Sequence, residues 1–359
     1  MIRQAYPAAF EINREFVELR CRHHEQELYI SKSFKKLFPT AGARCPFLDR
    51  FQSEFDNLNK ANPKPYEGPE ITVDERKELL AFIENQLIIN HPRAEYKQLL
   101  LAAKYFLAKV ESPKFVKPSR YNHSRWMKQL IQLIYIYVFR DEWHSRQYPL
   151  EDIEKLCLFG VKIYLKFWFE CTVARFAPLN DLNMFKSFSR IDDKGRNGQI
   201  KHVCLDTFEL HNFYVNGKLV ALAFFDERIS IEYLRQMVSS LQKDPPQNFS
   251  INPETMLIDL VNRSYLDFFR VSELPHDFLK DDPADWRNSD SFIYCQDVIC
   301  SLQVVNDTTE RTISAAKQYS NILTKDNSNL TNILHSVQAN ISSRQKPTKS
   351  AYQTPYKAD

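Results

Sequence analysis

Glycine is scarce in this sequence. Only six glycines occur in 359 residues, well below the roughly 7% of average proteins. Because glycine supplies the positive φ angles of tight hairpins and the close backbone approach of phosphate loops, this shortage disfavours hairpin-rich sheets and glycine-rich nucleotide loops. The chain also has no Walker loop, Rossmann fingerprint or serine nucleophile elbow. Helices are therefore the expected regular structure.

The chain lacks both a disulfide pattern and a long apolar run. Its seven cysteines are an odd number scattered through apolar sequence, which indicates reduced thiols in an intracellular protein. The N-terminus has no apolar core of signal-peptide length. The most apolar run, residues 130–139, is far shorter than the roughly 20 residues that cross a bilayer. We expect no membrane partner.

Charge of either sign is not in large excess. The net charge is +3, so nucleic-acid binding would need a local basic patch rather than the field of the whole chain. The hydrophobic content of 43% is enough for a large core, in one domain or in two that share an interface. The protein is expected to be globular.

Hydrophobic periodicity predicts a short strand followed by many helices. Partial alternation in residues 16–21 indicates the strand, and a helix follows over 24–37. The helices near 126–143 and 149–170 are apolar on most faces, so we place them at the centre of an all-α bundle. The remaining helices are expected at residues 45–58, 72–89 after a capping box, 94–110, 178–188, 200–211, 229–242, 252–270 and 327–340.

Two motif-like clusters lie at opposite ends of the chain. The first, Cys21-Arg22-His23-His24, follows the predicted strand, where α/β folds hold their chemistry. Cys21 and His24 have the spacing of half a zinc site, but a second half at suitable spacing is missing, so a packed cysteine and a solvent-facing histidine are favoured. His23 and His24 could also supply a general base.

The second cluster surrounds Glu310. In the sequence Asn306-Asp307-Thr308-Thr309-Glu310-Arg311, Glu310 could be one carboxylate of a magnesium site. The local chemistry favours a plainer role, in which Asp307 or Thr308 caps a helix and Glu310 lies in its first turn.

Two further segments have ordinary explanations. Gly195-Arg196-Asn197-Gly198 has the form of a phosphate clamp, but a plain turn is favoured in this polar run. The weakly basic tail segment 346–349 is expected to be a solvated chain end.

Taken in order, five segments make the chain similar to the C-terminal part of hAT-like transposon-derived proteins, which have an RNase H-like plan. These segments are Leu19-Arg20-Cys21-Arg22-His23-His24, Phe47-Leu48-Asp49-Arg50-Phe51, Asn122-His123-Ser124-Arg125-Trp126-Met127, Lys162-Ile163-Tyr164-Leu165-Lys166-Phe167-Trp168-Phe169 and Val305-Asn306-Asp307-Thr308-Thr309-Glu310-Arg311. The resemblance covers residues 15–340.

The resemblance implies roles for particular residues. Cys21 and His24 match a Cys-x-x-His motif, Arg125 and Trp126 match an Arg-Trp motif of a large helical insertion, and Glu310 matches the last carboxylate of a metal-binding triad. It also implies strands with two catalytic aspartates before the Cys-x-x-His motif, and these are not in the sequence. We therefore expect a truncated protein in which Glu310 is a relic.

The expected fold is mainly α, with a bundle-like helical insertion and a remnant of an RNase H-like α/β core. The predicted parts are a core remnant at 1–44, the insertion at 45–245, returning C-terminal helices at 246–341 and a polar disordered tail at 342–359. Because most of the sheet would be missing, the remnant should expose an edge strand, so instability or homo-oligomerisation should follow.

Three functions stay open at this point. The first is a truncated transposase-derived protein, catalytically inactive alone, that acts through DNA or protein binding in the cell, including the nucleus. The second is a fragment of an active DDE transposase, and only that full-length enzyme would use Mg²⁺. The third is a helical interaction scaffold. None of the three requires a small-molecule cofactor.

Overall fold

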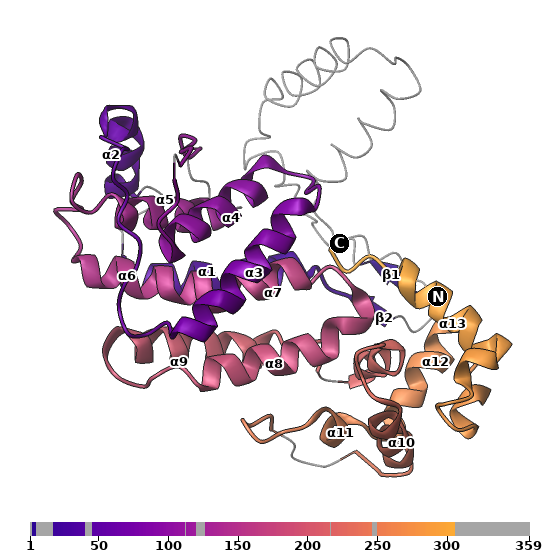
Figure 1. Ribbon diagram of the computed structural model, residues 1–359. Helices are drawn as coiled ribbons and strands as arrows, with labels where there is room; N and C mark the ends of the chain where they lie inside the picture. The colour runs from indigo at the N-terminus through magenta and orange to yellow at the C-terminus, as the bar shows by residue number, and fades with distance from the viewer. Residues whose placement is uncertain are drawn as a thin grey trace, which may run out of the picture. The chain divides into compact units, whose positions relative to one another are not determined.

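The computed structural model describes residues 2–4, 17–39, 45–111, 113–119, 126–215, 217–245 and 250–305. These residues are mainly helical (Figure 1), as the sequence predicts. The short strand expected in 16–21 is present as β2 (Val17–Leu19), which pairs in parallel with β1 (Ile2–Gln4). Val17 and Leu19 point inward and Glu18 outward, the alternation typical of a strand with one buried face.

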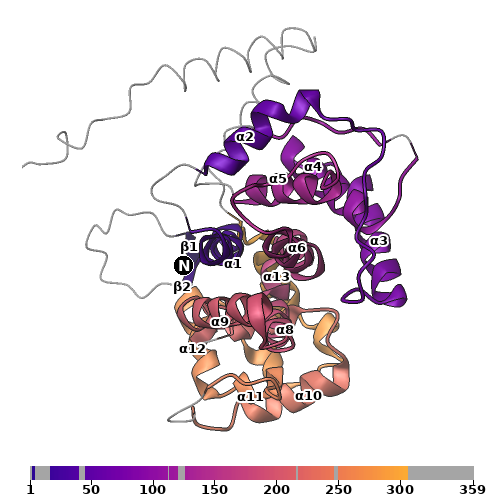
Figure 2. The same cartoon turned by 90° about the vertical axis from the view of Figure 1, so that its left-hand side faces the viewer.

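Helix α1 (Arg22–Leu37) follows β2 after a break of two residues. It lies along α9 (Gly195–Leu210), and it also contacts α5 (Met127–Val138) and α6 (Leu150–Phe159), so helices from distant parts of the sequence surround it (Figure 2). Eleven of its sixteen residues are buried, which is far more than one stripe. A helix buried on most sides is a central helix.

In the first half of the chain, the helices after α1 pack against one another. Helix α3 begins as the capping box predicts, because the Thr72 hydroxyl accepts a hydrogen bond from the Glu75 N–H at 3.2 Å. The elements of this half are α2 (Pro46–Glu54), η1 (Phe55–Asn57), α3 (Val73–Ile88), α4 (Ala94–Leu107) and α5 (Met127–Val138).

The apolar helix predicted at 149–170 contains a π-helical turn. Helix α6 (Leu150–Phe159) continues through η2 (Gly160–Tyr164) into α7 (Leu165–Glu170). Helices α5 and α6 pack against each other. Gly160 lies at this contact, where a Cβ atom would collide with the Leu130 side chain.

The second half of the chain differs from two sequence predictions. The prediction of one helix over 252–270 is wrong. A separate 3-10 turn begins after Asn262, whose side-chain oxygen accepts a hydrogen bond from the Ser264 N–H at 3.0 Å. The expected turn at Gly195–Gly198 instead forms the first turn of α9. The other elements are η3 (Ala174–Phe176), α8 (Ala177–Ser189), η4 (Gly217–Phe225), α10 (Ile231–Ser240), α11 (Leu257–Leu260), η5 (Arg263–Tyr265), α12 (Leu266–Ser272), η6 (Asp277–Lys280), η7 (Trp286–Asn288) and α13 (Asp290–Ser301).

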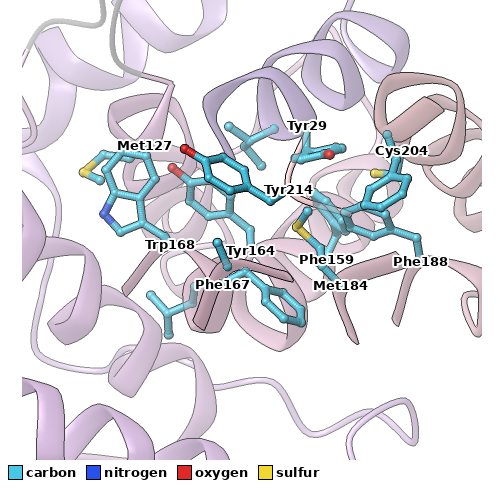
Figure 3. Packing of buried hydrophobic residues seen from close by; sticks show 14 of the residues in the cluster. Tyr29, Met127, Phe159, Tyr164, Phe167, Trp168, Met184, Phe188, Cys204 and Tyr214 are labelled. Atoms are coloured by element: carbon cyan, nitrogen blue, oxygen red, sulfur yellow. The ribbon is translucent and has the colours of Figure 1, made fainter. Parts of the chain in front are cut away.

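Large aromatic side chains fill the core around α1. Figure 3 shows Tyr29 of α1 among side chains of η2, α7, α8 and α9. Tyr29 contacts Phe188 with ring centroids 4.9 Å apart, and Tyr164 contacts Trp168 at 5.7 Å. Aromatic rings bury more apolar area per residue than other side chains, so this cluster supplies much of the hydrophobic stabilisation.

The predicted domain division stays a prediction. Met1–Asn306 forms one compact unit by its contacts. Helices of the predicted insertion, including α5 and α9, pack directly on α1. The predicted tail at 342–359 and the helix at 327–340 lie outside the described residues.

We predict that Gly160→Ala destabilises the protein by about 1–3 kcal/mol, because the new methyl group overpacks the contact with Leu130. Urea denaturation of Gly160→Ala, Leu130→Ala and the double variant measures this. The double variant should lose less stability than the sum of the two single variants, because the shortened side chain makes room for the methyl group. Additive losses would contradict the proposed clash.

Candidate functional site

The first turn of α1 contacts residues 303–305, which directly precede the cluster around Glu310 in the sequence. The Arg22 N–H donates a hydrogen bond to the Val304 carbonyl at 2.9 Å. A helix cannot satisfy its own first N–H groups, so this bond gives the Arg22 amide a partner from outside the helix. Gln303 forms an antiparallel bridge with Val173 and fixes the same segment from its other side. Residues 303–305 are thus held at the start of α1.

The Arg22 side chain forms a buried ion pair with Asp181 of α8. One guanidinium nitrogen donates to Asp181 Oδ2 at 3.0 Å, and a second donates to Oδ1. The two side chains are only 1% and 3% exposed. The guanidinium also lies 4.8 Å from the centre of the Tyr214 ring. This two-oxygen geometry ties α1 to α8 across 159 positions of sequence.

A second carboxylate, Glu25, is buried beside this pair. Its side chain is 5% exposed, and its Oε1 atom has no hydrogen-bond partner among the described residues. Burial raises the pKa of Glu25 to about 8, and the negative charge of Asp181 contributes to this rise, while Arg22 acts in the opposite direction. At neutral pH the Glu25 carboxyl group therefore holds a proton for most of the time.

Burial shifts the pKa values of the two ion-pair partners in opposite directions. Burial raises the pKa of Asp181, and the neighbouring Arg22 opposes this effect. Burial also lowers the pKa of Arg22, but the charge and hydrogen bonds of Asp181 together raise it by more, so the guanidinium remains charged. One cation thus faces two buried carboxyl groups. A proton on Glu25 balances the cluster.

The two histidines of the first motif have different environments. His23 is buried and stacks on Trp168, with ring centroids 3.9 Å apart and planes at 5°. His24, the next residue, is exposed on the other side of the helix, and Cys21 is half-buried. Residues one position apart on a helix point in different directions, which separates the two imidazoles. They do not share one site.

Trp126 of the Arg-Trp motif packs on α1. Its backbone N–H donates to the Glu27 carboxylate, and its ring lies 5.4 Å from that of Phe34. The Lys35 ammonium lies 5.1 Å from the centre of the same ring. Trp126 and the first motif are therefore brought together on one helix.

The other predicted site residues lie outside the described residues. These are Arg125, Asn306, Asp307 and Glu310. Within the described ranges, no group of three or more His, Cys, Asp and Glu side chains has an arrangement that could hold a metal ion. The assignment of Glu310 as a relic carboxylate stays a prediction.

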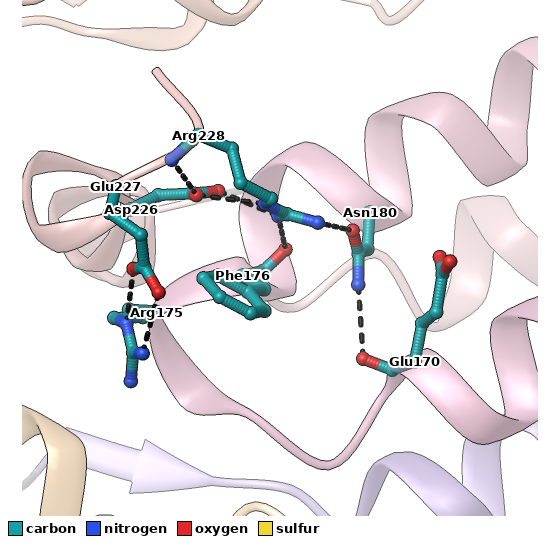
Figure 4. A network of polar contacts seen from close by, with 7 residues as sticks. All are labelled: Glu170, Arg175, Phe176, Asn180, Asp226, Glu227 and Arg228. Atoms are coloured by element: carbon teal, nitrogen blue, oxygen red, sulfur yellow. Dashed lines mark hydrogen bonds and ion pairs between the residues drawn. The ribbon is translucent and has the colours of Figure 1, made fainter. Parts of the chain in front are cut away.

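A second polar network, which the sequence did not predict, joins α8 to the loop before α10 (Figure 4). Arg228 donates to Asp226 at 2.6 and 2.8 Å and to the Asn180 side chain at 2.9 Å. Arg175 donates to both carboxylate oxygens of Glu227, at 2.6 and 2.9 Å. Each of the two arginines has its own carboxylate partner, which indicates a structural role.

A cavity of about 430 Å³ opens between the start of α3, η2 and the start of α9. Two of its lysines already have acidic partners: Lys155 lies 2.6 Å from Glu70, and Lys162 lies 3.2 Å from Glu75. The hydrogen bond from Lys155 lowers the pKa of Glu70. None of the predicted site residues lines this cavity.

Comparisons of the chain with protein-family models, with curated proteins and with solved structures gave no match. The described helices include none that is long and apolar enough to span a bilayer.

We predict that Asp181→Asn destabilises the protein by about 3–5 kcal/mol, because it removes the carboxylate that is hydrogen-bonded to the buried Arg22. The double variant Arg22→Met with Asp181→Leu should lose less, because it removes both charges from the core. Asp282→Asn, in the exposed pair with Arg235, is the control and should change stability little. Chemical denaturation of all three variants provides the comparison. Equal losses for Asp181→Asn and Asp282→Asn would contradict the account.

Glu25 should make stability fall as pH rises. Its folded pKa of about 8 exceeds the ordinary value of 4.5, so the native state binds a proton that the unfolded chain releases. Stability is highest below the unfolded pKa and decreases up to the folded pKa. Between pH 5 and 7 we expect a loss on the order of 2 kcal/mol, from about 1.4 kcal/mol per pKa unit.

Denaturation of wild type and Glu25→Gln at several pH values tests this. The variant should remove that part of the pH dependence, because glutamine stays neutral. Glu78→Gln, an exposed substitution on α3, should leave the wild-type profile unchanged. A Glu25→Gln profile parallel to that of wild type would show that Glu25 is ionised in the native state.

Proposed function

We propose that the chain is a transposase-derived protein of the hAT-like type that binds DNA and does not cut it on its own. The observation that carries this proposal is that the segments of the resemblance converge on one helix. The first segment ends in the first turn of α1, and Val304, the residue before the last segment, binds that turn.

The three middle segments contact the same helix or its end. Trp168 stacks on His23, and Trp126 contacts Phe34. Phe47 lies 5.6 Å from Phe38, the residue that ends α1. Because these segments are far apart in the sequence, their convergence on α1 supports a common structural role for the motifs.

The carboxylates beside the first turn of α1 are poor metal ligands, which supports a role without strand cleavage. Two-metal phosphodiester chemistry needs ionised carboxylates that can reach both ions. Asp181 has both oxygens bonded to Arg22, and Glu25 is buried with its pKa raised to about 8. Neither group offers a free anionic oxygen to a cation.

DNA binding and the absence of cleavage can be measured on the same sample. We expect the purified chain to bind a labelled duplex in the range of about 10⁻⁴–10⁻⁶ M at physiological salt, with affinity falling steeply as salt rises. With Mg²⁺ or Mn²⁺ present, the duplex should remain intact in a nicking assay.

Two results would contradict this proposal in different ways. Nicking that Glu310→Gln abolishes would identify an active DDE enzyme. Asp297→Asn, which removes an exposed acid on α13, is the matched control and should not change any nicking. Failure to bind any duplex at low salt would favour the helical interaction scaffold instead.

A further inference from the structure

A basic and aromatic surface lies where β2 ends, beside the start of α1 and the end of α9. We call it the Arg20 surface. It consists of Arg20, His24, Lys32, His211 and Phe213, all of them exposed or half-exposed. The ion pair of Arg22 uses none of these side chains, and Phe213 packs partly against the core.

Two contacts join Arg20, Phe213 and His211. The Arg20 guanidinium lies 4.0 Å from the centre of the Phe213 ring, and the His211 ring lies 6.0 Å from the same ring. Arg20 is still 44% exposed; its Nε atom is 3.2 Å from Glu18, and one of its terminal nitrogens donates to the same carboxylate at 3.4 Å. A guanidinium has five N–H donors, so an arginine that stacks on a ring and pairs with one carboxylate retains donors for a second anion.

Buried groups anchor this surface from below. The Tyr214 hydroxyl donates to the Arg20 carbonyl at 2.6 Å, and Tyr214 is fully buried against Arg22. The buried Tyr214 thus fixes both residues: it is bonded to the Arg20 backbone, and it directly follows Phe213 in the sequence. Such anchoring reduces the conformational entropy that these protein residues lose when a ligand binds.

The charges around His211 are mostly positive. Burial lowers the pKa of His211, and Lys32, His24 and Arg20 lower it further. The acids near this surface are Glu18, already paired with Arg20, and Asp206 and Glu209 on the exposed face of α9. A bound anion would relieve this repulsion.

We propose that the Arg20 surface binds the phosphate backbone of DNA and that binding is coupled to proton uptake by His211. The inference rests on the DNA binding proposed above. His24 and Lys32 are eight residues apart on α1, hence about 12 Å along its axis. That length corresponds to three or four phosphates at about 3.4 Å per step of one strand.

The coupling follows from linkage. A phosphate beside His211 favours the imidazolium, so it raises the pKa of His211 in the complex above that of the free protein. Affinity must then increase as pH falls through the pKa of the complex, and level off below that of the free protein. Histidine is the side chain that titrates in this range of about pH 5–8.

Fluorescence anisotropy of the full chain with a duplex of roughly 20 base pairs tests the inference at about pH 5.5 and pH 8 and at several salt concentrations. Wild-type affinity should be about tenfold higher at the lower pH. The slope of log K against log salt should steepen by about 1 for each histidine that gains a phosphate contact. Circular dichroism at both pH values verifies that each protein is folded.

Three variants separate the contributions. His211→Gln should lose most of the pH effect while retaining affinity at the higher pH, whereas Arg20→Gln should weaken binding at both pH values. His144→Gln, an exposed histidine between α5 and α6, should match wild type. If His211→Gln does not fold, Lys32→Gln provides the second test and should reduce both affinity and the salt slope.

The outcomes distinguish this inference from the proposed function. If wild type binds no duplex at either pH, DNA binding itself is wrong. If it binds but His211→Gln and Arg20→Gln behave like His144→Gln, DNA binding stands and the Arg20 surface is not its site. Equal, pH-dependent binding to phosphatidylserine vesicles would assign the surface to membranes and overturn the inference.

Discussion

Arg22 joins three separate parts of this fold through two different groups. Its backbone N–H holds the Val304 carbonyl, and its guanidinium holds the Asp181 carboxylate of α8. The Tyr214 ring lies against the same guanidinium, and the Tyr214 hydroxyl fixes the Arg20 carbonyl. Because buried charges cost several kcal/mol unless their bonds are complete, this geometry tolerates little displacement. The start of α1 is therefore the fixed point of the described residues.

This constraint connects the interior to the surface. The residues near Arg22 have different environments. His23 is buried against Trp168, whereas Arg20 and His24, two positions away on either side, face solvent. A rigid β2–α1 junction thus presents two basic side chains in defined positions while their neighbours fill the core. Burial of Glu25 in a protonated form removes a negative charge that would otherwise oppose this basic surface. The buried cluster of Arg22, Asp181 and Glu25 therefore positions the side chains that we propose contact phosphate.

The sequence predicts the local features of the fold better than its long-range contacts. Apolar periodicity and the Thr72 cap locate most helices, since these depend on residues three or four positions apart. The Asn262 turn, which interrupts a helix, depends on one side chain that competes for the backbone. The partner of Arg22 lies 159 positions away, so no spacing rule reveals it. An acid within the apolar stretch around Asp181 is the one local sign of a buried charge.

The most direct test of this account is amide hydrogen exchange at Arg22. Because Arg22 is the first residue of α1, its N–H has no acceptor within the helix, and its protection depends on the Val304 carbonyl. If residues 303–305 are held at the start of α1, this amide exchanges as slowly as the buried interior of the helix. Exchange at the rate of an exposed loop amide would show that residues 303–305 are not held at the start of α1.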